Sequence, residues 1–412
     1  MPITENTSTA FIDLDLLDPV LTELRDQVRT FAENVVRPKV AINDASAAET
    51  LDWDIVQAGH DLGLTRLVVP KAFGGLGYGI KAAAIALEEL GAVDAGTALI
   101  FGATLLGQAP LLLSGDEQLQ GQYLSRFASD KAVLACNAIT EDRSGCDLLI
   151  PENTRFAESD VIATPDGDSY IITGRKRFIT NGAVADFGSV YANIEGMPPE
   201  DGYTCFVVPF DKDVETASIA DKTGYRNCLG TEIYFHDVRV PASNIIGDIG
   251  LGVEINIQQM NMARSTVAAL STGVARGAFE LARSFAHERR QGGKQLWEHQ
   301  FTAQKIADMA TQIEASRLLY LRGSDVADNQ IPVPALEPAI AKLHADRMAI
   351  DVAQTAMSIM GARGYLREYG IEKYMRDALG ARIYEGTPEV LALAITQSIM
   401  NPDDFENGED QW

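Results

Sequence analysis

The sequence predicts an α+β protein in which a small β domain separates two helical domains. Residues 1–132 carry apolar residues at helical spacing, interrupted by short links that contain glycine or proline. Residues 133–246 change to short runs bounded by Gly, Asp, Asn or Pro, as strands are. Residues 247–412 return to the helical period in long segments with short links, which is typical of a helical bundle. We therefore expect an N-terminal helical domain (1–132), a small middle β-barrel or sandwich domain (133–246) and a C-terminal four-helix-bundle domain (247–412).

The individual elements follow from the same periodicities. The N-terminal domain should contain helices over Leu16–Val36, Trp53–Leu64, Ala82–Leu90, Thr97–Leu113 and Glu117–Phe127. The middle domain should contain strands over Asp160–Ala163, Ser169–Thr173, Phe178–Thr180, Ser189–Ala192, Thr204–Phe210 and Thr231–Val240. Two apolar stripes predict the packed faces of the C-terminal helices: Ile306, Met309, Ile313 and Leu321 in the first, and Ile340, Leu343, Ile350, Ala353, Met357 and Met360 in the second.

Composition excludes several classes of function. The chain has 58 acidic and 34 basic residues, and a formal charge of −24 argues against a nucleic-acid partner, which needs a basic surface. We find no run of about 18 apolar residues and expect no membrane span. The N-terminus lacks the basic region of a secretory signal, and the four cysteines have no CxxC spacing, so we expect a cytoplasmic protein with reduced thiols. The five histidines are scattered without HExxH spacing, so we expect no metal.

One carboxylate stands in a setting that suits acid–base chemistry. Glu385 lies between an aromatic residue and a glycine in the stretch Ala381–Glu389, and apolar segments flank this stretch on both sides. A loop held between two packed helices would aim the side chain and partly desolvate it, as a base that takes a proton from carbon requires. The alternative is that Glu385 caps the helix that starts near Thr387.

Five motifs, in order along the chain, connect these features to a known family. They are Cys136–Glu141, Phe178–Gly182, Glu288–Lys294 with His299 and Gln300, Gly361–Tyr365 with Met375–Ala378, and Tyr384–Thr387. Each motif is weak alone. Together, in this order and spacing, they make the chain resemble the acyl-CoA dehydrogenase family from about Leu16 to Met400.

The resemblance implies an FAD enzyme that oxidises the Cα–Cβ bond of an acyl thioester. Glu385 would remove the α-proton while the β-hydride passes to flavin N5. Phe178 resembles the aromatic residue that covers one face of the flavin, with a place in the β-domain core as its alternative. The other cofactor positions implied by similarity are Thr140, Cys146, Thr180, Arg289, Gln300, Gly361, Ala362, Thr387 and Glu389.

The resemblance also implies partners and a quaternary structure. In such proteins the positions of Arg289 and Gln300 reach the flavin of a neighbouring subunit, so we expect a homodimer or a homotetramer. The thioester would lie near Cys146, Asn261, Arg264 and Gly386, although ordinary helix polarity explains Asn261 equally well. An electron-transfer flavoprotein is the expected electron acceptor.

Departures from the family pattern leave the acyl carrier open. Cys146 replaces a hydroxyl donor with a weaker thiol, and Asp142 and Arg143 add charges at the mouth of the site. The substrate is therefore an acyl-CoA or, alternatively, an acyl group on a carrier protein of a biosynthetic pathway. A homologue without catalysis, serving in assembly, is the alternative of another class. The family's other position for the base falls near Met262, Ala263 and Arg264, where this chain has no carboxylate, which favours Glu385.

Overall fold

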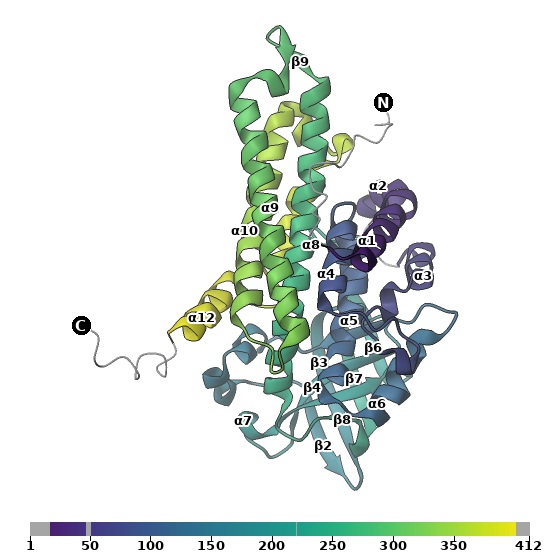
Figure 1. Cartoon of the computed structure of the whole chain (residues 1–412). Coiled ribbons are helices and arrows are strands. Elements are labelled where there is room, and N and C mark those ends of the chain that lie inside the picture. Colours follow the sequence, from purple (N-terminus) through teal and green to yellow (C-terminus); the bar gives the residue numbers. More distant parts are fainter. Residues whose placement is uncertain (1–16, 47–50, 220, 401–412) are drawn as a thin grey trace, which may run out of the picture.

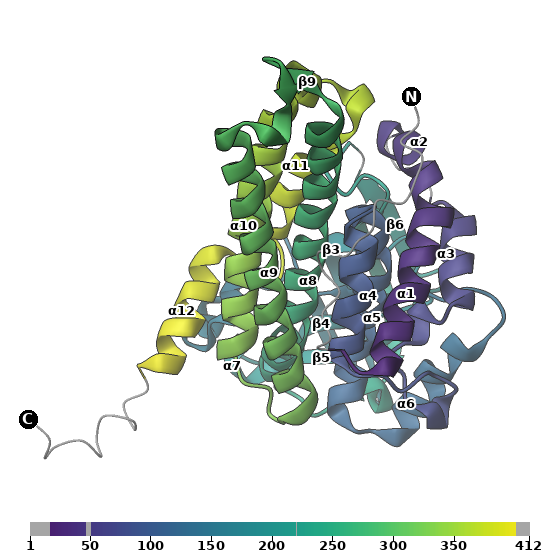
Figure 2. The same cartoon turned by 45° about the horizontal axis from the view of Figure 1, so that its top comes forward.

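The computed structural model describes residues 17–46, 51–219 and 221–400 of the 412-residue chain. Long helices of the C-terminal domain stand side by side at one end of the molecule, and the sheet of the middle domain lies at the other end (Figure 1). The N-terminal helices run along one flank of both, as the rotated view also shows (Figure 2). The three expected domains are therefore present in the expected order.

The N-terminal domain is helical throughout. Its helix α5 is long and apolar enough to span a membrane by composition, contrary to the expectation from the sequence. The most apolar part of α5 is 67% buried, however, because α5 packs between α4, the long C-terminal-domain helix α8 (Gly252–Glu288) and the sheet, so its composition reflects the protein core. The α-helices of this domain are α1 (Pro19–Phe31), α2 (Val40–Ala45), α3 (Trp53–Asp61), α4 (Ile80–Gly91), α5 (Ala95–Ser114) and α6 (Glu117–Tyr123).

The middle domain is one eight-stranded sheet with the order β6-β7-β3-β2-β4-β5-β8, and β1 pairs in parallel with β4. Two predicted strands merge into the single strand β3, which bends at two register shifts, between Ile172 and Gly174 and between Lys176 and Ile179. The sequence did not predict β1, β6 or β8, which are short or weakly patterned. The strands are β1 (Ala135–Ala138), β2 (Ile162–Asp166), β3 (Ser169–Thr180), β4 (Phe187–Ile194), β5 (Tyr203–Pro209), β6 (Val214–Ile219), β7 (Gly230–Pro241) and β8 (Ile245–Ile246).

The C-terminal domain is built around the 37-residue helix α8. The predicted second stripe is only partly right, because α10 buries an alanine-rich face whereas Ile340, Leu343 and Ile350 are half-buried. Small side chains let α10 approach α8 closely. The main helices are α8 (Gly252–Glu288), α9 (Gln300–Asn329), α10 (Leu336–Met360), α11 (Ile371–Ala381) and α12 (Pro388–Ile399), and β9 (Arg290–Gln291) pairs with β10 (Lys294–Gln295) between α8 and α9.

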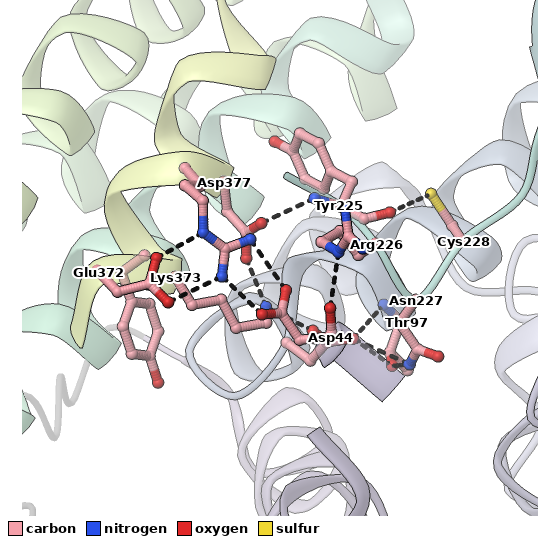
Figure 3. A network of polar contacts seen from close by, with 12 residues as sticks. Asp44, Thr97, Tyr225, Arg226, Asn227, Cys228, Glu372, Lys373 and Asp377 are labelled. Carbon is pink, nitrogen blue, oxygen red and sulfur yellow. Dashed lines mark hydrogen bonds and ion pairs between the residues drawn. The ribbon is translucent and has the colours of Figure 1, made fainter. Parts of the chain in front are cut away.

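A buried polar network joins all three domains next to α11 (Figure 3). The ammonium group of Lys373 pairs with Asp377 at 2.5 Å and with Asp94, the N-cap of α5, at 2.6 Å. Asn227 of the middle domain donates to Asp94 at 3.1 Å, and the backbone N–H of Tyr225 donates to Asp377 at 2.8 Å. Removing one partner would leave a buried charge uncompensated, so this network fixes α11, and the chain that follows it, relative to the other domains.

Candidate active site

The loop at residues 382–386 joins α11 to α12 and carries Glu385. Glu385 has φ of +53° and Gly386 has φ of +97°, so two successive residues adopt left-handed backbone. For a non-glycine residue this conformation costs roughly 1–3 kcal/mol and persists only where the surrounding structure enforces it. Thr387, not Glu385, occupies the N-cap position of α12, so the capping alternative for Glu385 is wrong. Thr387 and Glu389 lie at the start of this helix.

The surroundings of the carboxyl group of Glu385 suit a base better than a structural anion. Its Oε2 atom is buried and has no hydrogen-bond partner among the described residues. Burial raises the pKa of Glu385 to about 7, although the positive charges of Lys342 and Arg264 oppose this shift. A base with a pKa near neutral combines a large ionised fraction with useful basicity.

Arg264 faces the same space from α8. Its Nη1 donates to Oδ1 of Asn261 at 2.8 Å, and Asn261 in turn donates to the carbonyl oxygen of Val333 at 3.0 Å. Burial lowers the pKa of Arg264 to about 10, while the carboxylate of Glu385 acts in the opposite direction. The Nε atom of Arg264 lacks a hydrogen-bond partner in the described part of the chain, so this guanidinium has a donor left for a ligand. Asn261 uses its side chain in these internal bonds.

Two other carboxylates near the matching motifs, Glu141 and Glu389, are unsuited to the role of base. Glu141 is buried and accepts hydrogen bonds from Ser159 and from the ammonium group of Lys176, at 3.1 and 2.5 Å. Glu389 is exposed on the first turn of α12. Glu385 is therefore the carboxylate whose surroundings suit proton abstraction.

A cavity enclosed mainly by α4, α5 and α8 ends at Tyr384 and Glu385. The amide group of the lining residue Gln259 is held by the protein itself, since its Nε2 donates to the carbonyl oxygen of Leu106 at 2.7 Å and its Oε1 accepts from the hydroxyl of Tyr191 at 2.7 Å. Glu385 is the charged side chain in the described lining, so the cavity suits an apolar group attached to a carbon that Glu385 can reach. The remaining lining residues are Val68, Ile80, Ala83, Leu87, Leu99, Gly102, Leu105, Ala109, Leu112, Met262, Ala263, Thr266, Val267 and Leu270.

One part of the predicted cofactor site lies in the middle domain. Phe178 has φ of +59° at a register shift of β3 and is 61% exposed, so the alternative place in the β-domain core is wrong. The carbonyl oxygen of Thr140 accepts from the backbone N–H of Arg177 at 2.9 Å, which places Thr140 beside Phe178. Thr180 ends β3 opposite Gly230. Exposed aromatic surface with two threonines near it in the fold fits a planar ring with polar edges, such as a flavin.

Cys146 begins a short helix between the middle domain and α8. This short helix (Cys146–Leu149) contacts α8, the helix that carries Arg264. Gly386 also approaches Arg264, because a Cβ atom on this glycine would lie 3.7 Å from the arginine Nη2. The structure thus brings Cys146, Arg264, Gly386 and Glu385 together at one place.

The remaining predicted cofactor residues lie far from this place. Arg289 ends α8 and Gln300 begins α9, at the end of the bundle where β9 lies and opposite to the sheet (Figure 1). Gly361 and Ala362 follow α10 at the same end, where Lys305 near the start of α9 donates to Ser358 at 3.0 Å. At 1.5 Å per residue the 37-residue helix α8 is about 55 Å long. One chain therefore does not bring these residues to Phe178.

Comparisons with known proteins agree with this arrangement along the whole chain. The N-terminal, middle and C-terminal domain models of the acyl-CoA dehydrogenases match residues 19–131, 136–238 and 250–400. The chain belongs to the acyl-CoA dehydrogenase family. It is 34% identical to a cyclohex-1-ene-1-carbonyl-CoA dehydrogenase of Geobacter metallireducens over 92% of this chain and 97% of that protein.

Several solved structures superpose closely on this chain. Butyryl-CoA dehydrogenase of Megasphaera elsdenii matches with a TM-score of 0.87 and 29% identity, over 95% of this chain and 100% of its own. The prolyl acyl carrier protein oxidase AnaB matches with a TM-score of 0.84 and 25% identity, over 93% and 99%. A glutaryl-CoA dehydrogenase of Mycobacterium smegmatis, solved with FADH2, matches with a TM-score of 0.82 and 25% identity, over 93% and 95%.

As an acyl-CoA dehydrogenase family member, the protein is an FAD-dependent oxidoreductase that acts on CH–CH bonds. The residues present fit this cofactor, since exposed Phe178 and the two threonines suit its ring system. Arg289 adds an exposed guanidinium group of the kind that binds diphosphate.

Sequence reasoning missed several residues that shape the site. Lys342 and Asp346 lie within the apolar pattern of α10, and their polarity among buried neighbours was the available signal. Tyr225 comes from the loop between β6 and β7, and its ring packs against that of Tyr384 with centroids 6.0 Å apart. No local pattern marks Tyr225, because its role depends on a contact across domains.

Proposed function

We propose that this protein dehydrogenates an acyl-CoA thioester between its α and β carbons, with Glu385 as the base that removes the α-proton. The observation that carries the proposal is the buried, unpartnered carboxyl oxygen of Glu385 at the end of an apolar cavity. Its pKa of about 7 suits a base that has to work near neutral pH.

The chain's own residues provide the polar part of the reaction. A thioester α-proton is weakly acidic, so charge that develops on the thioester carbonyl must be stabilised while Glu385 takes the proton. The backbone N–H of Glu385 is the donor that we assign to this carbonyl. The apolar cavity excludes water from the α-carbon, which keeps the carboxylate basic. FAD supplies the acceptor for the β-hydride when it is bound.

The acyl group is uncharged in this proposal. The cation Arg264 lies beside Gly386 and Glu385 and not in the described lining of the cavity, so a second carboxylate at the far end of the acyl group would be buried there without a partner, which is costly. We infer an aliphatic or alicyclic acyl chain.

Coenzyme A is the proposed carrier, and a carrier protein is the alternative. The related AnaB oxidase, which acts on a prolyl acyl carrier protein, keeps this alternative open. At the mouth of the site, however, Arg143 pairs with Glu158 and Asp160, and Arg177 pairs with Asp142 at 2.6 Å. These arginines are already matched by carboxylates, which makes them a poor surface for an acidic carrier protein.

We also propose that the active form is a homodimer or a homotetramer. The cofactor residues are divided between two distant ends of one chain, so a second copy has to complete each site. Exposed aromatic side chains at the end near Arg289 suit such a contact: Trp297, Phe301 and Tyr365. Helix α12 projects from the body of the protein in both overall views, and its Leu393 and Ile399 are exposed (Figures 1 and 2).

The electron acceptor and the compartment complete the proposal. An electron-transfer flavoprotein is the expected acceptor for a dehydrogenase of this family. All four cysteines are free thiols, which supports work in a reducing compartment such as the cytoplasm.

The deciding experiment compares the wild type with Glu385→Gln by anaerobic stopped-flow bleaching of the flavin. A panel of acyl-CoA thioesters, with acyl carrier protein thioesters of the same acyl groups, identifies the substrate on the wild type. Glu385→Gln should keep FAD and bind thioester, while flavin reduction slows by at least ~10²-fold. Equal rates would exclude Glu385 as the base, and a wild type that no thioester bleaches would favour the assembly homologue.

A further inference from the structure

A fully buried lysine lies directly against the loop that carries Glu385. Lys342 of α10 has 0% exposure. Its ammonium group donates to Oδ2 of Asp346 at 2.8 Å, to the carbonyl oxygen of Ala381 at 2.9 Å and to the carbonyl oxygen of Gly386 at 3.1 Å. An ammonium group has three donors, so these three contacts use all of them.

The two carbonyl groups bracket Glu385. Ala381 is the last residue of α11, where a cation interacts favourably with the helix dipole, and Gly386 directly follows Glu385. The left-handed backbone of Glu385 needs a restraint from outside the loop. The Nζ atom of Lys342 also lies 5.8 Å from the centre of the Tyr384 ring, within the range of a cation–π contact.

We propose that Lys342 is a positioning residue that holds the loop at 382–386, and with it the carboxylate of Glu385, in its reactive geometry. Asp346 orients Lys342 in turn, and its other oxygen lies 3.4 Å from the hydroxyl of Ser271. The catalytic consequence rests on the proposed function, whereas the restraint on the loop does not.

The charges around the loop give the proposal a signature in pH. Burial raises the pKa of Glu385, the cations Lys342 and Arg264 lower it, and the anion Asp346 raises it. Arg382 on the loop itself acts on Asp346, and the Tyr384 and Tyr225 phenols face the loop as neutral groups, because burial raises the pKa of both. Removing the charge of Lys342 should therefore raise the pKa of Glu385, and removing that of Asp346 should lower it.

Hydrogen–deuterium exchange tests the restraint without any need for catalysis. In the FAD-loaded protein, Lys342→Met should speed exchange across residues 381–387 by about 10-fold or more, since two carbonyl anchors of the loop are lost. The matched control is Arg317→Met, which removes another buried cation, but one whose guanidinium group pairs with Glu88 of α4 and Glu314 of α9 instead of the loop. Wild-type exchange at 381–387 in Lys342→Met, or an equal increase in Arg317→Met, would overturn the proposal.

The pH profile of flavin reduction tests the catalytic consequence. Lys342→Met should slow reduction by about 10-fold or more and move the profile to higher pH, whereas Asp346→Asn, which keeps the ammonium contacts to the loop, should move it to lower pH. If Lys342→Met does not fold, the shift of the pH profile in Asp346→Asn still tests the proposal. If the pH profiles of flavin reduction in both variants coincided with that of the wild type, the proposed role of Lys342 would be overturned. Failure of the proposed function would give a different result. In that case no thioester would bleach the flavin of the wild type, whereas the faster hydrogen–deuterium exchange of Lys342→Met would still be observed.

Discussion

The hydroxyl oxygens of Tyr225 and Tyr384 lie 3.4 Å apart, so the middle domain contacts the loop at residues 382–386 one residue before Glu385. The two rings meet edge to face, an arrangement that is favourable beyond simple burial. Tyr225 is itself anchored through its backbone N–H to Asp377 of α11. The position of Glu385 therefore depends on the junction of domains as well as on its own loop.

Tyr225→Phe should weaken this junction while it keeps the ring contact. Because the hydroxyl of Tyr384 loses its partner, we expect the free energy of unfolding to fall by about 1 kcal/mol and flavin reduction to slow a few-fold. Thermal melting and stopped-flow reduction measure the two effects. The matched control is Tyr170→Phe, in which a tyrosine packed edge to face with Phe206, away from the loop, loses its hydroxyl. Equal behaviour of the two variants would contradict the prediction.

Glu385→Gln should stabilise the protein in a pH-dependent manner. The pKa of Glu385 is raised from 4.5 to about 7, so the folded protein holds this proton more tightly than the unfolded chain does. The free energy of unfolding of the wild type therefore falls as the pH rises from 4.5 to about 7. Above about pH 7 this decrease amounts to up to about 3 kcal/mol. Glu385→Gln avoids this loss, so its melting temperature should exceed that of the wild type at about pH 8 and match it at about pH 4.5. A gain that is equal at both pH values would contradict the assigned pKa.

Gly102→Ala should narrow the acyl cavity without destabilising α5. The added Cβ would lie 3.3 Å from Cδ1 of Leu87 inside the cavity lining. We expect kcat/KM to fall more for long acyl chains than for short ones, while the alanine contributes up to about 1 kcal/mol of helix stability. Gly121→Ala on α6 is the matched control, because its Cβ meets only Phe73 at 3.7 Å, outside the cavity. An identical chain-length profile in both variants would show that Gly102 does not limit the cavity.

Arg289→Ala should weaken FAD binding in the assembled protein. The exposed guanidinium group at the end of α8 is the proposed ligand of a neighbour's diphosphate, and such a charge-assisted contact contributes about 1.5–3 kcal/mol. The ratio of flavin to protein after gel filtration, together with the mass from sedimentation, measures the loss. Arg290→Ala is the control, since Arg290 bonds to the carbonyl oxygen of Gly293 at 3.0 Å. A monomer that retains FAD would contradict both the contact and the assembly.

Much of the fold followed from periodicity, and the failures have physical causes. Helices such as α4 and α5 were predicted within a few residues, because their apolar spacing is regular. The merging of two predicted strands into β3 was missed, since Gly174 allows a bend where its Cβ would lie 2.2 Å from the carbonyl oxygen of Asp160. The buried face of α10 was predicted from its large apolar residues. In the structure this face is rich in alanine, because small side chains allow close packing against α8.

Candidate site residues could be predicted from the sequence where they lie in or near a local sequence motif. Glu385 and Phe178 occupy motif positions, and the resemblance also implies Arg264. The structure buries Arg264 and the Oε2 atom of Glu385 and exposes Phe178, whereas the roles of these residues stay predictions. Lys342 was not predicted, because its significance lies in carbonyl groups about 40 residues further along the chain. Contacts of this range depend on the folded backbone and not on any local pattern.

The burial of Lys342 also has a chemical consequence for a protein that handles activated acyl groups. Thioesters acylate amines that offer a free lone pair, and this amine lies against the loop that we propose contacts the thioester. With all three N–H bonds donated to Asp346, Ala381 and Gly386, the nitrogen has no electron pair to offer and no path to the carbonyl carbon. The protein can thus keep a positive charge beside its own electrophilic substrate without becoming the target of self-acylation.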